Sequence, residues 1–218
     1  MNVTGSTFSE EDFSKKDLVG SVFSKCNFYR CNFNRTDLTD AKFENCRFIE
    51  AGDIEGCSFE YAQLKDASFK ESDLSMAQFT GAHCLGIEFR SCNMKGCNFS
   101  RASFCNYITQ NTFFSSAYIT GCNLSYSNFE NQRLEKCDLF ENRWNGANLM
   151  RASLKGSDLS RCEFSEEQWG QFVVEECNLC HVDLTGLDLR RVKLKGVMIS
   201  DWQQEQLLEP FGLCILPS

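Results

Sequence analysis

The sequence predicts an all-β solenoid that occupies almost the whole chain. A Phe or Leu recurs at every fifth position, as at Phe28, Phe33 and Leu38, and a small residue stands two positions before each of them. Two residues five positions apart lie on different faces of an α-helix and on opposite sides of a β-strand. Neither element therefore keeps the recurring large residues on one side. The chain must therefore turn a corner in every repeat. Short extended faces joined by regular corners form a stack of coils, and each face sends one small and one large side chain inward.

The repeat covers residues 1–199 and is interrupted twice. The first interruption lies between Phe48 and Phe59, where the spacing is eleven residues and the segment IEAGDIEG, residues 49–56, fits no normal pair of repeats. Loops on a rigid scaffold often carry binding residues, so two explanations stay open here: a projecting loop, or decay of the repeat without a role. A loop at this place would offer three carboxylates to a partner: Glu50, Asp53 and Glu55.

The second interruption is the segment of residues 105–116. The spacing from Phe104 to Ile119 is fifteen residues and stays in phase, which places Tyr107 in a small inward position and Thr109 in a large one. Neither residue type suits its position, so a projecting loop and simple decay of the repeat are again the alternatives. The candidate binding residues of this second loop are Tyr107, Ile108, Thr112, Phe113 and Phe114.

After Ile199 the repeat stops, and residues 200–218 form a C-terminal segment. Asp201 is the expected N-cap with Gln204 three positions later, and Pro210 limits the helix, so the pattern predicts a short α-helix followed by an apolar tail. The end of a solenoid exposes core and strand edges, and this segment either folds back as a cap or forms a contact between two copies. The candidate contact residues are Trp202, Leu207, Leu208, Phe211, Leu213 and Ile215.

The composition excludes several classes of partner. The 218 residues carry a formal net charge of −8 and a sequence pI of about 4.9. Such a charge disfavours direct binding of nucleic acid or of an anionic membrane. No apolar run is long enough for a transmembrane span or a signal peptide, so we expect a cytoplasmic protein.

Fourteen cysteines invite a disulfide or metal interpretation, but their positions favour structural thiols. Most of them occupy the small inward position, which Ala or Ser fills in other repeats, so cysteine serves as a small buried hydrophobe. Cys177 and Cys180 form a C-x-x-C pair, a weak zinc signal, because the two side chains diverge in this register. No cluster of acids and bases indicates a polysaccharide-cleaving enzyme, and no face repeats Thr as an ice-binding solenoid would. We expect no catalytic site, metal or cofactor.

The repeats GANLM, GSDLS and GCNLS match the A-(D/N)-L-x-x motif of pentapeptide-repeat proteins. Over essentially its whole length the chain also resembles the Qnr family of quinolone-resistance proteins, through FIEAGDIEGCSF, SAYITGCNLSY and the ending DWQQEQLLEPFG. One departure lies beside the second loop, where this chain has Phe114, Ser115 and Ser116 and family members often read FCSAY. The resemblance implies a right-handed quadrilateral β-helix with two projecting loops, a short C-terminal α-helix and a homodimer formed head to head through the C-terminal residues.

The resemblance also implies a function without catalysis. Members of this family bind the type II topoisomerases DNA gyrase and topoisomerase IV and protect them from fluoroquinolones. An acidic rod of regular width can occupy a channel built for DNA, which is itself a regular negative rod. The alternative is a DNA-mimicking inhibitor or regulator of these enzymes that gives no protection against the drug. We expect the apolar second loop to supply anchoring contacts and the acidic first loop to tune approach and orientation in a salt-dependent way.

Overall fold

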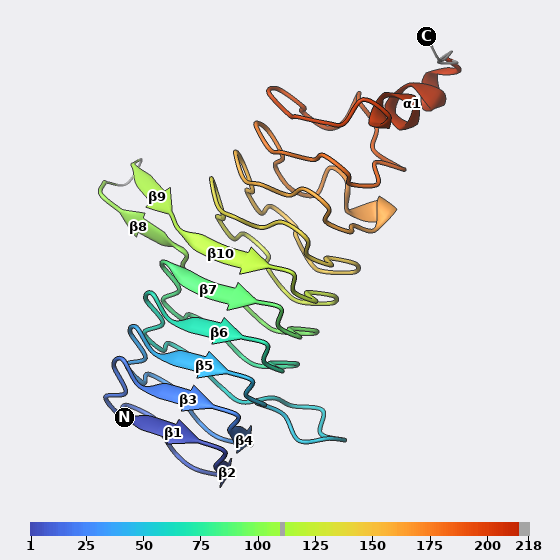
Figure 1. Ribbon diagram of the computed structural model, residues 1–218. Coiled ribbons are helices and arrows are strands. Elements are labelled where there is room, and N and C mark those ends of the chain that lie inside the picture. Colours follow the sequence, from blue (N-terminus) through green and yellow to red (C-terminus); the bar gives the residue numbers. More distant parts are fainter. Residues whose placement is uncertain (110–111, 214–218) are drawn as a thin grey trace.

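The computed structural model describes residues 1–109 and 112–213, which coil into a right-handed, four-sided β-helix (Figure 1). The hydrogen-bond register gives the number of sides. Residues 2 and 22, 7 and 27, 12 and 32, and 17 and 37 pair in parallel, so each of four successive faces lies against the face twenty positions later. We number the faces from the first to the fourth in this order. The four-sided coil that the resemblance implies is confirmed.

The first face is a continuous parallel sheet in its N-terminal half. Its strands follow in the order β1-β3-β5-β6-β7-β10. The second face holds the pair β2-β4, and most other pairings are isolated bridges. The strands of the coils are β1 (Asn2–Thr4), β2 (Thr7–Ser9), β3 (Val22–Ser24), β4 (Asn27–Tyr29), β5 (Lys42–Glu44), β6 (Ser68–Lys70), β7 (Ile87–Arg90) and β10 (Ala117–Thr120).

The remaining elements lie outside this regular pattern. An antiparallel hairpin consists of β8 (Cys105–Tyr107) and β9 (Phe113–Ser115). A 3-10 turn, η1 (Glu166–Gln168), interrupts one late coil, and the chain ends in α1 (Gln203–Leu208) and η2 (Glu209–Phe211). No helix in the described part of the chain is long and apolar enough to span a membrane.

The large inward residues form columns that run along the rod. In the N-terminal half these columns are mostly phenylalanine, and equivalent rings of successive coils stack face to face. The Phe79 and Phe99 rings have centroids 4.7 Å apart and planes 2° apart, and the Phe13 and Phe33 rings are 4.8 Å apart. Rings of adjacent faces meet edge to face, which is the other favoured aromatic geometry. The predicted apolar interior is thus confirmed, and it is mostly aromatic in the N-terminal half.

The corner residue of each repeat, two positions after the large inward residue, adopts the left-handed backbone conformation. Arg35 and Tyr61, for example, have φ values of 58° and 56°. Their amide groups remain paired, since the Arg35 N–H donates to the Glu60 carbonyl at 2.9 Å. Glycine is required at a corner only where a neighbouring side chain crosses it: a Cβ on Gly81 would lie 2.5 Å from the Tyr61 ring.

The small inward position is filled by groups that both pack and donate. The Sγ of Cys162 lies 3.0 Å from the Leu139 carbonyl, and the Thr36 hydroxyl donates at 2.8 Å to the Phe13 carbonyl. In both cases the acceptor is the large residue 23 positions earlier, in the preceding coil. The prediction of buried structural thiols is confirmed for most of the cysteines. Their role as weak hydrogen-bond donors was not predicted.

Two parts of the coil depart from the regular inward pattern. The five-residue count places Trp169 in a large inward position, but the η1 turn sends Gln168 inward instead and leaves Trp169 only half-buried. At the N-terminal end, Glu11 and Lys16 fall in small inward positions and are exposed. The first coil is therefore open to water there, as their charge predicts.

Candidate functional site

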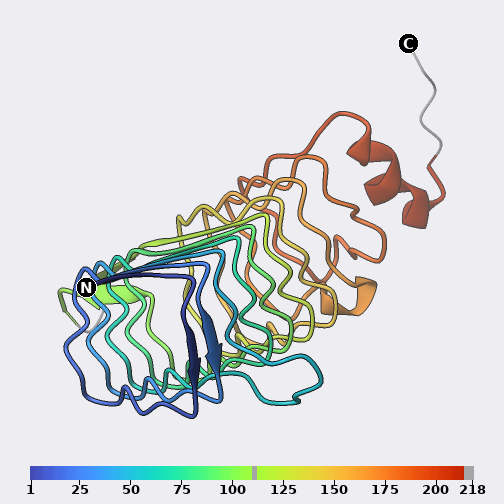
Figure 2. The ribbon, with the colours of Figure 1, turned by 60° about the horizontal axis from the view of Figure 1, so that its bottom comes forward.

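Two loops project from diagonally opposite edges of the rod (Figures 1 and 2). The segment 49–56 leaves the corner between the second and third faces, and the β8–β9 hairpin leaves the corner between the fourth and first faces. The strand-pairing register gives the length of both insertions. β5 and β6 pair residues 42 and 68, and β7 and β10 pair residues 87 and 117, so the loops add six and ten residues to a coil of twenty. Decay of the repeat is thereby ruled out at both places.

Arg30 holds the base of the first loop from the preceding coil. Its Nη1 lies 2.8 Å from a Glu50 oxygen and 3.1 Å from an Asp53 oxygen, and its Nε lies 3.4 Å from Glu10. The nearby Glu50 and Asp53 carboxylates raise the pKa of the Arg30 guanidinium. Two of the three carboxylates that the sequence offered to a partner therefore have an internal counter-ion, and Glu55 is the exposed one outside this cluster.

The tip of the first loop is apolar. Ile54 is 80% exposed, more than any other large hydrophobic side chain in the described residues. Ile54 was not among the predicted binding residues of this loop, which were all acidic. The signal was present, because an isoleucine between two acidic residues in a segment that leaves the rod has no core to enter. The first loop thus offers one apolar contact beside one free carboxylate.

The second loop is a β-hairpin, and this corrects the in-phase interpretation of residues 105–116. β8 and β9 pair Tyr107 with Phe113, and the Ile108 N–H donates to the Thr112 carbonyl at 2.8 Å near the tip. Tyr107 and Thr109 are exposed and occupy no inward position. The fifteen-residue spacing from Phe104 to Ile119 is a multiple of five because the insertion itself has ten residues.

The side chains of the hairpin differ in exposure. Phe113 is half-buried, with its ring 5.6 Å from the Tyr107 ring and the Arg133 guanidinium 4.7 Å above it. Phe113 therefore anchors the hairpin to the rod. Ile108 is 68% exposed, Tyr107 54% and Phe114 49%, and Thr112 is exposed as well. These four side chains are free to contact another molecule.

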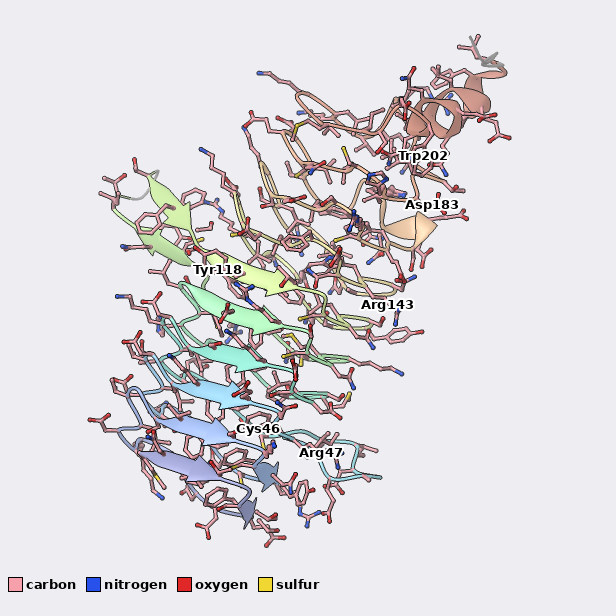
Figure 3. The ribbon with its side chains drawn as sticks, in the orientation of Figure 1. Cys46, Arg47, Tyr118, Arg143, Asp183 and Trp202 are labelled. Atoms are coloured by element: carbon pink, nitrogen blue, oxygen red, sulfur yellow. The ribbon has the colours of Figure 1, made fainter. Side chains whose placement is uncertain are left out.

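A hollow of about 320 Å³ lies at the foot of the hairpin. Phe114 forms one wall, and Tyr118 on β10, which lies beside the hairpin, forms another (Figure 3). Lys136 and Asp138 from the next coil line the other side. A partner that contacts Phe114 would thus meet an aromatic wall and one charge of each sign.

The C-terminal segment covers the last coil of the rod. Gln203 is fully buried: its Nε2 donates to the Leu179 and Val182 carbonyls at 2.9 Å and 2.6 Å, and its Oε1 accepts from the Ser200 N–H at 2.6 Å. The predicted helix is confirmed, but it begins after Trp202. The expected N-cap was wrong: the Asp201 carboxylate accepts only the adjacent Trp202 N–H.

The six candidate contact residues of this segment divide into three groups. Leu207 packs into the core of its own subunit, and Leu208 is half-buried. Trp202, Phe211 and Leu213 are exposed, and Trp202 stands at the end of the rod opposite β1 (Figure 3). Ile215 lies outside the described residues. The apolar surface of this end is thus carried by residues on both sides of α1.

Family models for pentapeptide repeats match the repeat part of the chain from residue 23 to residue 166. The family model "Pentapeptide repeat region" matches residues 23–96, and "Pentapeptide repeats (8 copies)" matches segments from residue 97 to residue 166. A curated relative, Pentapeptide repeat protein VPA0095 of Vibrio parahaemolyticus serotype O3:K6 (strain RIMD 2210633), is 70% identical over 47 residues. That match spans only 22% of this chain and 22% of the relative.

Solved structures are similar over the full length. Full-length QnrB1, described as a plasmid-mediated fluoroquinolone resistance protein, is 41% identical with a TM-score of 0.93, over 98% of this chain and 100% of that one. A trypsin-treated QnrB1 variant is 40% identical with a TM-score of 0.87, over 100% and 99% of the two chains. The coil, both insertions and the C-terminal segment all lie within this match. The chain therefore belongs to the pentapeptide-repeat family, as a protein of the Qnr quinolone-resistance type.

Proposed function

We propose that this chain binds the type II topoisomerases DNA gyrase and topoisomerase IV and protects them from fluoroquinolones, without chemistry of its own. The observation that carries the proposal is the full-length likeness to a plasmid-mediated fluoroquinolone resistance protein. The geometry supports it, since a regular rod with a net charge of −8 suits a channel built for DNA. We place the interaction in the cytoplasm, where these enzymes act on DNA.

The two loops are the proposed means of distinguishing drug-bound enzyme from working enzyme. A rod without loops would occupy the DNA channel in either state and would inhibit. Exposed apolar side chains that project from a scaffold can anchor a protein interface, and Ile108 and Phe114 are of this kind. Ile54 gives the first loop a smaller anchor of the same kind. The contribution of the first loop should therefore depend less on salt than its acidic sequence suggested, because the Arg30 guanidinium pairs with Glu50 and Asp53 and offsets one of their two negative charges.

The structure allows each loop to be removed at a corner. Deletion of residues 106–115 joins Cys105 to Ser116, which then becomes the corner residue before Ala117. Deletion of residues 50–55 joins Ile49 to Gly56 before Cys57 in the same way. Both deletions restore the coil of twenty residues, so both proteins should keep the circular dichroism of the parent.

The assay is DNA supercoiling by gyrase at a fixed ciprofloxacin concentration over a titration of each protein. We expect the hairpin deletion to abolish protection and the first-loop deletion to weaken it. Phe114→Ser removes an exposed aromatic ring from the hairpin. Its matched control is Tyr126→Ser, which removes an aromatic ring that is 68% exposed from another edge of the rod. The control should protect as the parent does. Full protection by the hairpin deletion would refute the role of that loop and would indicate that the surface of the rod is responsible for protection.

The alternative is a DNA-mimicking inhibitor that gives no drug-specific protection. It predicts that the parent protein slows supercoiling without ciprofloxacin at the concentrations where it acts with the drug, and that both deletions leave this inhibition unchanged. We further propose that two copies associate through the C-terminal end, because Trp202, Phe211 and Leu213 expose apolar surface there. A contact of this kind suits a two-fold axis.

A further inference from the structure

One edge of this acidic rod is free of acidic corner residues. The edge lies between the third and fourth faces, and its corner residues stack through a backbone ladder: Lys15 N–H to Asn34 carbonyl, Arg35 to Glu60, Tyr61 to Thr80 and Gly81 to Ser100. We call it the basic edge. Its corner residues are Lys15, Arg35, Tyr61, Gly81, Arg101, Asn131 and Arg151.

The other three edges carry acids at the same corner positions. The edge of the first loop has Glu10, the edge between the first and second faces has Glu71 and Glu141, and the edge of the hairpin has Asp40 and Asp66. The net charge of −8 is thus distributed unevenly, and four cations lie in line along one edge. A partner that follows this edge meets a line of corner cations on a molecule whose net charge is negative.

Three of these cations form no ion pair in the part of the chain that the structure describes. Within residues 1–109 and 112–213, neither Lys15 nor Arg35 nor Arg101 forms an ion pair with a carboxylate. Arg151 does, with Glu130 at 2.6 Å. The Arg35 guanidinium instead lies 5.7 Å from the centre of the Tyr61 ring in the next coil, which holds it at the edge.

A hollow of about 510 Å³ opens beside Arg101. Its lining is polar, with Thr80, Asn98 and Ser100 on one side and Asn131 and Gln132 on the other. Glu130 also borders it, but that carboxylate is engaged by the Arg151 guanidinium. The amide donors of the lining are engaged within the protein, since Asn98 Nδ2 donates to Gln78 and Gln132 Nε2 to the Phe99 carbonyl. The Arg101 guanidinium is therefore the group of this hollow that suits an incoming carboxylate.

From this arrangement we propose that the basic edge binds an extended acidic segment of a partner protein, and that one carboxylate of the segment enters the hollow beside Arg101. Coils are spaced by about 4.8 Å, so Arg35 and Arg101, three coils apart, are roughly 14 Å apart along the edge. An extended chain rises about 3.3 Å per residue, so acidic residues four positions apart match this distance and point to the same side.

The flanks of the edge favour a single polypeptide over duplex DNA. Asp12 lies on the third face and Asp17 and Asp37 lie on the fourth, on either side of the basic corner residues. A duplex presents phosphates across a wide front and would meet these carboxylates. The surface also lies on a different edge from both loops, so its role can be tested apart from protection of topoisomerases.

The probe is a fluorescein-labelled, extended peptide with Glu at every fourth position and Ser or Thr between, followed by fluorescence anisotropy at low salt. The test variant is Arg35→Gln with Arg101→Gln. The matched control is Arg143→Gln with Arg161→Gln, which changes the net charge equally but removes cations that are paired with Glu163 and Glu141. We expect the test variant to weaken binding about fivefold and the control to leave it nearly unchanged.

Three outcomes would overturn the proposal. The first is no binding of the peptide to the parent protein. The second is equal weakening by test and control variants, which would make the effect one of total charge. The third is tighter binding of a short DNA duplex than of the peptide at the same salt, which would assign the edge to nucleic acid. Binding that is weakened about fivefold in the test variant alone, with unchanged gyrase protection, supports a separate interaction surface.

Discussion

Gln168→Leu tests whether buried side-chain amides hold the late coils together. Gln168 is 2% exposed, and its Oε1 accepts from the Ser165 N–H at 2.7 Å. Its Nε2 donates to the Trp144 and Ala147 carbonyls at 3.0 Å and 2.7 Å. Leucine has a similar size, so the volume stays filled while three hydrogen bonds are lost. The Trp144 carbonyl still accepts from the Ala147 N–H, at 2.8 Å, whereas the Ser165 N–H and the Ala147 carbonyl lose the partner that Gln168 supplied.

The expected cost follows from that count. A net contribution of about 1 kcal/mol for each of the three hydrogen bonds gives a loss of about 3 kcal/mol. Natural domains have a total stability of about 5–15 kcal/mol, so such a loss is large enough to measure without preventing folding. The measurement is urea unfolding followed by circular dichroism.

Glu167→Leu is the matched control, because Glu167 is the exposed neighbour in the same η1 turn. Its change in unfolding free energy should stay within about 0.5 kcal/mol. If Gln168→Leu unfolds at the same urea concentration as the parent, the buried amide does not stabilise this coil and the reasoning fails. If both variants lose equal stability, the cause is the conformation of the turn and not the three hydrogen bonds.

Leu139→Arg should prevent stable folding, because an unpaired charge in this fully buried position costs several kcal/mol. The control Lys136→Ala should change the unfolding free energy by no more than about 0.5 kcal/mol. A soluble Leu139→Arg variant with the melting temperature of the parent would contradict the inward placement of Leu139. Burial raises the pKa of the Cys46 thiol from 9.0 to about 11, so its contribution to stability is complete below pH 9 and is lost as the pH rises towards 11. Cys46→Ala should therefore reduce the fall in stability over that range, and a thiol reagent should react with the buried cysteines of the parent only after denaturation. Trp202→Ser with Phe211→Ser should convert a dimer to a monomer in light scattering and keep the melting curve of the coil; a clean dimer would place the contact elsewhere.

The regular part of the fold could be predicted because every repeat solves the same geometric problem. A corner in each five residues fixes which side chains point inward, so positions as distant as Phe28 and Leu139 were both correctly placed in the core. The number of faces did not follow from the repeat itself. It needed the register of one coil against the next, which the resemblance supplied and the pairing of residues twenty apart confirmed.

The contents of the loops were less predictable, because they depend on contacts between coils. The Arg30–Glu50 ion pair joins residues one coil length apart, so the signal becomes visible once the coil is known to have twenty residues. The hairpin was hidden for a different reason. An insertion of ten residues keeps a five-residue count in phase, and only the unsuitable Tyr107 and Thr109 revealed it.

The buried glutamines had a signal that was misjudged. The segments that begin at Ser165 and at Ser200 share the pattern Ser-x-x-Gln, in which the side chain of the fourth residue returns to the backbone N–H of the first. Asp201 with Gln204 three positions later offers the same spacing one residue along the chain, and that pair predicted the N-cap wrongly. The pattern also explains why Gln168 displaces Trp169 from the inward position, since the turn advances the chain before the next face begins.

At the left-handed corners, the side chains that form the surface of the protein are separate from the residues that form its core. Lysine, arginine, aspartate, glutamate, tyrosine and methionine all occupy corners, because the residue there contributes its amide to the ladder and its side chain to solvent. The side chains of an edge can therefore be substituted one at a time during evolution with little effect on the packing of the core. A scaffold of this kind is well placed to acquire new partners, and the four edges of one rod can diverge independently while the coil that carries them stays the same.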